Sequence, residues 1–169
     1  MASYTVASDA YVMLGQPDQA REEMALGASR LPGKPELLIP YGRLLINQGR
    51  YTEAREVLRG ISAPQPSQTI RARKLVVESY QKTNRIAEAI DEMVNLVETF
   101  PTDLSLRMSL VDLYSEASLF AKAVDTLRAA KKFPEVPPGS LDARIRDLLK
   151  QEEEKRKRRG MEETQTLAP

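Results

Sequence analysis

The chain lacks the side chains on which most enzyme chemistry depends. None of its 169 residues is Cys or His, which removes disulfides, thiol nucleophiles, imidazole bases and the usual zinc ligands. Acidic pairs such as Glu22 and Glu23 or Glu162 and Glu163 are adjacent in sequence, so on a helix their carboxylates do not face each other. A glycine-rich phosphate loop is also missing from the sequence. The sequence therefore predicts a protein that is not an enzyme and that needs no metal or cofactor.

The charged residues that could recognise a partner form a group of cations, Arg43, Arg71 and Lys74, with Lys82 further along. An acidic segment or a C-terminal carboxylate would complement them. An ordinary solvated helix face, with Glu78 and Asp112 balancing the cations, is the alternative interpretation. The whole chain has a net charge of only +1 and a pI near 7.9, whereas nucleic-acid binders usually have a pI above about 9. We therefore expect a protein or peptide partner and no nucleic acid.

The elements that must position these cations follow a fixed period. Alanines recur at intervals of 34, 35 and 34 residues, and the other landmarks keep the same step: Ala20, Ala54, Ala89 and Ala123; Gly15 and Gly49; Tyr11, Tyr80 and Tyr114; Pro32, Pro66 and Pro101. Self-similarity at this period indicates stacked supersecondary units, which build extended concave surfaces for holding a partner. The spacing therefore predicts how the protein works more clearly than what it binds.

Each period contains apolar residues at helical spacing on both sides of a helix-breaking turn, which predicts an all-α chain of antiparallel hairpins. The longest break covers residues 61–69 and reads as an inter-repeat loop. After a stop at residues 137–139, Ser140 is a candidate N-cap for a final helix with an apolar stripe of Leu141, Ile145, Leu148 and Leu149. Its polar extension carries three acid-to-base pairs at i,i+4, Glu152/Arg156, Glu153/Lys157 and Glu154/Arg158, which favour continued helix. We predict repeats at 2–34, 35–68, 70–103 and 104–137, a capping helix with a charged extension at 140–159, and a flexible tail at 160–169.

These features resemble the tetratricopeptide repeat (TPR) family over roughly residues 2–159. The resemblance depends on the small residue that opens each second helix, the aromatic residue in the first helix, and the terminating prolines Pro32, Pro66, Pro101 and Pro134. The chain departs from the family pattern at Leu45, Val77 and Val111, and Pro40 is expected inside a first helix, within its first turn. The resemblance implies a right-handed superhelical α-solenoid that acts as a scaffold or adaptor in complex assembly.

By the same resemblance, a partner segment lies along a concave groove lined by the first helix of each repeat. The groove residues are those that face away from the buried stripes, and Met and Ile among them suit an amphipathic or extended segment. An alternative is that several of the apolar ones are core. The predicted groove residues are Thr5, Asp9, Val12, Met13, Ile39, Arg43, Ile46, Asn47, Arg71, Lys74, Glu78, Gln81, Lys82, Met108 and Asp112. The carboxylate-clamp pattern by which some TPR domains grip chaperone C-termini is not met.

The sequence is also compatible with other functions. The array could be a structural subunit that packs or self-associates within a larger multi-repeat protein, because the repeat pattern begins almost at the first residue. RNA binding is disfavoured by the near-neutral charge. The basic run Lys155–Arg159 reads as a solvated helix end or a short basic patch. The sequence shows no signal peptide and no membrane span, so cytoplasm is the default expectation.

Overall fold

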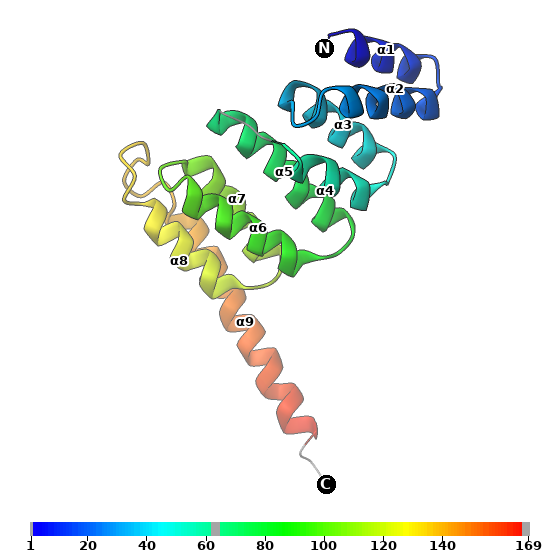
Figure 1. The fold of residues 1–169 in the computed structure, drawn as a ribbon. Coiled ribbons are helices and arrows are strands. Elements are labelled where there is room, and N and C mark those ends of the chain that lie inside the picture. The colour runs from blue at the N-terminus through cyan, green and yellow to red at the C-terminus, as the bar shows by residue number, and fades with distance from the viewer. Residues whose placement is uncertain (1, 62–64, 167–169) are drawn as a thin grey trace. The chain divides into compact units, whose positions relative to one another are not determined.

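The computed structural model describes residues 2–61 and 65–166, which form helices and no strand. Figure 1 shows the helices as successive antiparallel hairpins. The chain divides into two compact units, Met1–Glu92 and Met93–Pro169, and α6 belongs to both. The helices are α1 (Ala2–Met13), α2 (Pro17–Arg30), α3 (Pro35–Asn47), α4 (Tyr51–Arg59), α5 (Pro66–Lys82), α6 (Ile86–Thr99), α7 (Leu104–Glu116), α8 (Phe120–Ala130) and α9 (Asp142–Thr166). The predicted all-α solenoid class is confirmed.

The four periodic alanines lie at close contacts in the packed interior of the hairpins. Ala20, Ala54, Ala89 and Ala123 are all 0% exposed. Interiors are close-packed, so a larger side chain at such a position would force its neighbours apart. The fixed spacing of a small residue therefore reports the helix contact of each repeat.

A second close contact, between α3 and α4, depends on Gly42. A Cβ atom at Gly42 would lie 2.6 Å from both Cγ and Cδ2 of Leu58. Carbon atoms at rest stay about 3.5–4.0 Å apart. Gly42 is thus required for this approach, and the periodic landmarks of the sequence do not include it.

The turn inside each hairpin has one geometry. Gly15 and Gly49 adopt positive φ, and so do Asn84 and Ser118, both at φ 55°. In every case the next residue donates its backbone N–H to a carbonyl five residues earlier: Gln16 to Tyr11, Arg50 to Leu45, Arg85 to Tyr80 and Leu119 to Tyr114, at 2.7–2.9 Å. This bond belongs to the Schellman motif, which ends a helix through one left-handed residue. The turns therefore recur at the spacing of the alanines.

Two prolines lie elsewhere than predicted. Pro66 begins α5 and does not terminate the preceding helix, because its fixed φ and missing N–H suit a first helical position. The inter-repeat break is correspondingly shorter than 61–69, and its residues 62–64 lie outside the described part. Pro40 lies inside α3, beyond the first turn, since that helix begins at Pro35.

In the second unit, α9 packs on α8 and is held by charged contacts. Lys131 Nζ donates to Asp142 Oδ1 at 2.7 Å, Arg144 pairs with Asp112, and Lys155 Nζ donates to the Ser118 carbonyl at 2.7 Å. Leu148 is buried, whereas Leu149 is 44% exposed, so the predicted apolar stripe is only partly covered.

The bounds of α9 differ from the predicted cap. The helix begins at Asp142, and Ser140 donates its hydroxyl to the Pro137 carbonyl instead of capping. It continues to Thr166, through most of the predicted flexible tail, and Leu167–Pro169 lie outside the described residues. Two of the predicted i,i+4 pairs form, Glu152 with Arg156 at 3.0 Å and Glu153 with Lys157 at 2.7 Å. Such pairs stabilise a helix that has little to bury.

Candidate functional site

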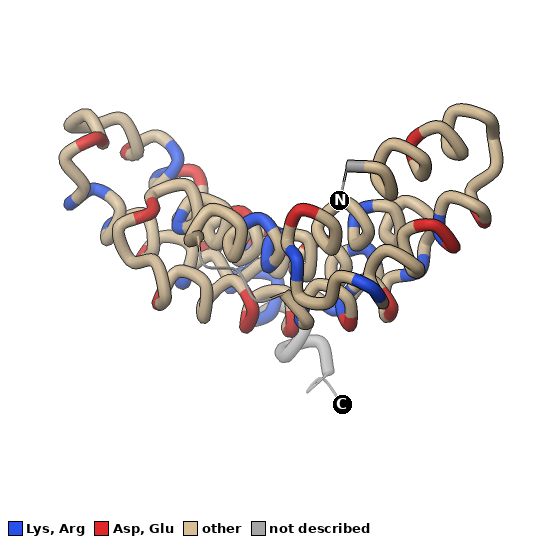
Figure 2. Tube along the Cα trace, turned by 45° about the horizontal axis from the view of Figure 1, so that its top comes forward, with Lys and Arg blue, Asp and Glu red and all other residues tan. Residues whose placement is uncertain are grey.

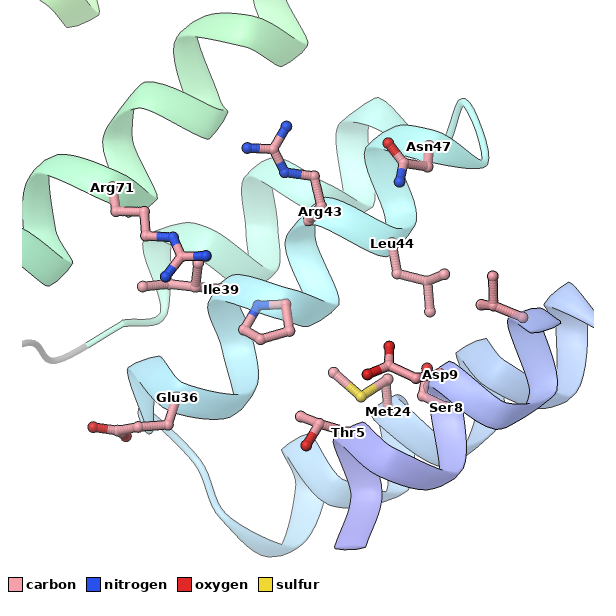
Figure 3. Close-up of a pocket in the computed structure, with 12 residues that line it drawn as sticks. Thr5, Ser8, Asp9, Met24, Glu36, Ile39, Arg43, Leu44, Asn47 and Arg71 are labelled. Atoms are coloured by element: carbon pink, nitrogen blue, oxygen red, sulfur yellow. The ribbon is translucent and has the colours of Figure 1, made fainter. Parts of the chain in front are cut away.

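A cleft of about 410 Å³ opens between α1 and α3 in the first unit (Figure 3). Side chains from α1, α2, α3 and the first half of α5 line it: Thr5, Ser8, Asp9, Val12, Met24, Glu36, Ile39, Pro40, Arg43, Leu44, Asn47 and Arg71. Seven of these belong to the predicted groove, namely Thr5, Asp9, Val12, Ile39, Arg43, Asn47 and Arg71. The 34-residue period therefore brings together first-helix residues that are far apart in sequence.

The floor of this cleft is apolar. Met24 is 1% exposed and Ile39 is 4% exposed. Ile39 thus belongs to the core and presents only its edge to the cleft, while Val12, at 49% exposure, forms part of the wall. An apolar floor beside polar side chains that can fix the orientation of a ligand is typical of a binding site.

The rim of the cleft is charged, and one rim residue is held from the neighbouring repeat. Arg43 Nη1 donates to Glu78 Oε2 at 3.1 Å, joining α3 to α5. Figure 3 shows Asp9 on α1 and Arg71 on α5 approaching the cleft from opposite sides. Glu36, at one end, accepts a hydrogen bond from Gln68 Nε2 at 3.0 Å.

A second cleft, of about 370 Å³, adjoins the first between α3 and α5. Arg43 and Arg71 line both clefts, and the second adds Ser67, Ile70, Lys74, Leu75 and Glu78. The cations Arg43, Arg71 and Lys74, grouped together by the sequence analysis, therefore share one surface. Glu78 balances one of the three charges through its pair with Arg43.

The remaining predicted groove residues do not line these clefts. Ile46 is only 4% exposed and lies in the core, because α3 is packed against helices on several sides. Met13 is 88% exposed at the end of α1. Gln81 and Lys82 lie at the end of α5. Met108 and Asp112 belong to α7 of the second unit, where Asp112 pairs with Arg144 of the cap.

Five residues of the first cleft are not among the predicted groove residues. These are Ser8, Met24, Glu36, Pro40 and Leu44. The helical periodicity predicts which face of a helix a residue occupies. It does not predict whether a cleft opens beside that residue.

The described part of the chain contains no group of three or more acidic residues placed to hold a metal ion.

Within each unit, Lys and Arg are interspersed with Asp and Glu along the helices (Figure 2). Burial raises the pKa of the hydroxyl of Tyr41, a core residue of α3, above its usual 10.0. No helix among the described residues combines the length and apolar character that crossing a bilayer requires. The arrangement can bind a partner through shape, apolar contact and charge.

Packed helix hairpins around a lined cleft define a helical-repeat scaffold for protein interaction. The tetratricopeptide repeat family model matches residues 11–77, in agreement with the family resemblance predicted from the sequence. Comparison with curated proteins gives no match.

Several solved structures share this fold. MamA from Desulfovibrio magneticus RS-1, residues 41 to the end, is 20% identical with a TM-score of 0.59, and the match covers 97% of this chain and 96% of that one. Another MamA structure is 16% identical with a TM-score of 0.61, covering 90% and 84%. YrrB, described as a TPR protein with an unusual peptide-binding site, is 12% identical with a TM-score of 0.54, covering 83% and 70%. At these identities the likeness shows the fold alone.

Proposed function

We propose that the protein is a scaffold or adaptor that binds a peptide or protein segment in the two clefts along α1, α3 and α5. The observation that carries this proposal is the convergence of seven predicted groove residues on one cleft with an apolar floor and a charged rim. A segment that places acidic residues near Arg43, Arg71 and Lys74 and apolar residues beside them suits the clefts. The binding role requires no catalytic group.

Site-specific photocrosslinking in the source cells tests this role. A photoreactive amino acid is introduced at Val12 or Asn47, in the cleft, and at Lys132 in the second unit as a control. We expect one partner to be crosslinked from both cleft positions and not from the control. Crosslinking of the same partner from Lys132 alone would place binding elsewhere and overturn the proposal.

A second candidate function is structural assembly, in which the chain packs or self-associates through α1. The observation that favours it is the exposure of Val6 (64%), Met13 (88%) and Leu14 (71%) at the first hairpin. Exposed apolar side chains gathered on one element mark interaction surfaces. Sedimentation velocity tests this role: concentration-dependent association that Met13→Glu/Leu14→Glu abolishes supports it, and a monomer at all concentrations contradicts self-association.

A further inference from the structure

The two clefts contain exposed charged side chains that have no partner within the described part of the chain. Asp9, Arg71 and Lys74 form no ion pair or side-chain hydrogen bond with any residue in 2–61 or 65–166. Several other charged side chains of the first unit are paired, as in Arg50–Glu53, Arg73–Glu92 and Arg85–Glu88. Exposed charges without a partner among the described residues also occur outside the clefts, as at Glu22, Lys34 and Glu56, but those in the clefts flank an apolar floor.

The signs of these charges are separated across the clefts. Asp9 belongs to α1, whereas Arg71 and Lys74 lie three residues apart on α5, where like charges repel each other. The apolar floor formed by Met24 and Ile39 belongs to the cleft between them. A ligand that neutralises the charges on both sides of the clefts must carry a cation near Asp9, an apolar group over the floor and a carboxylate at Arg71 and Lys74.

We propose that the segment bound here is a polypeptide with a basic residue, an apolar anchor residue and one or more acidic residues, in that spatial order from α1 to α5. This inference rests on the proposed function and specifies its partner. A polyanion such as RNA fits less well, because Asp9 and Glu36 would repel its phosphates on the α1 side of the first cleft. A uniformly acidic peptide would meet the same repulsion.

Selection from a phage-displayed library of random peptides on the full chain tests this order. Enriched peptides are synthesised, and their affinities are measured by fluorescence anisotropy. Charge-assisted contacts justify an expected loss of about tenfold or more for Arg71→Glu/Lys74→Glu and a smaller loss for Asp9→Lys. The matched controls Lys132→Glu/Lys150→Glu and Glu22→Lys, at exposed positions outside both clefts, should leave the affinity within about twofold.

A steric variant separates this inference from the proposed function. Val12→Arg narrows the first cleft at a half-exposed position. Peptides that lose binding to Val12→Arg but show neither the charge order nor sensitivity to the charge reversals would overturn the inference and leave the proposed function standing. Failure to enrich any peptide that Val12→Arg displaces would overturn both. Circular dichroism of each variant checks that the helices are retained.

Discussion

Adding one methyl group at Gly42 is expected to destabilise the protein, although alanine is the better helix former. A Cβ atom there would lie 2.6 Å from both Cγ and Cδ2 of Leu58 and 3.0 Å from Cδ1. Leu58 is only 3% exposed, and because its branch carbon is among the atoms that clash, the whole side chain must move. Overpacking of this kind costs about 1–3 kcal/mol, against a helix-propensity gain of about 1 kcal/mol. We expect Gly42→Ala to lower the free energy of unfolding by about 1–2 kcal/mol.

Gly27→Ala is the matched control for this substitution. A Cβ atom at Gly27 would lie 2.9 Å from Cγ of Tyr4 and 3.2 Å from Cδ2 of Leu37. The contacting Tyr4 atoms, Cγ and Cβ, lie at the base of its side chain, so relief requires a shift of α1. That helix packs against fewer helices than α3 does, so we expect the propensity gain and the steric cost to offset each other within about 1 kcal/mol.

A double-mutant cycle with Leu58→Ala, measured by urea unfolding, isolates the steric contact. In that background the clashing carbons are absent, and Gly42→Ala should stabilise the protein by about 1 kcal/mol through helix propensity. An equal effect of Gly42→Ala in both backgrounds would refute the reasoning, because it would show that the contact with Leu58 does not set the cost.

Three further predictions concern the turns, the hairpin contact and the cap. Ser118→Gly should raise the free energy of unfolding by about 1 kcal/mol in urea titrations, because glycine adopts φ 55° without strain, and a loss of stability would contradict the turn geometry. Ala54→Leu, at 0% exposure, should lower it by about 1–3 kcal/mol through overpacking, whereas a neutral result would show an open contact. The hydrogen bond from Lys131 holds the pKa of Asp142 below its usual 3.8, so this contact contributes stability above that pH and loses it as the pH falls through the lowered pKa. The urea midpoint of Lys131→Met should therefore fall below that of the parent at neutral pH and approach it in acid, and a gap that persists in acid would refute the assignment.

The features that the sequence predicted well are those that a single residue type determines locally. Alanine at a fixed period marks a close helix contact, and Ala20, Ala54, Ala89 and Ala123 are all fully buried. Proline is less informative, because it suits both the end of one helix and the first turn of the next. Pro66 was assigned to the wrong one of these two positions for that reason.

The candidate site was predictable only in part, because equivalent positions in the repeat do not have equivalent surroundings. Val12 and Ile46 are separated by one 34-residue step, yet Val12 is 49% exposed and Ile46 is 4% exposed. The helix α3 contacts α1, α2, α4 and α5, whereas α1 contacts only α2 and α3 among the helix pairs with substantial contact in the described chain. Periodicity gives the register of a residue, and the number of flanking helices decides its burial.

The shared geometry of the four hairpin turns makes them natural junctions for exchanging parts. Two of the turns have glycine, Gly15 and Gly49, and the others have Asn84 and Ser118. The backbone nevertheless passes through each turn by one residue in the left-handed conformation and the same bond to a carbonyl five residues earlier. A first helix from one repeat can therefore be joined to a second helix from another at these positions without altering the local path of the chain. Chimaeras spliced there would allow the α1, α3 and α5 faces to be duplicated or reordered, which would change the recognised segment while the turn chemistry stays the same.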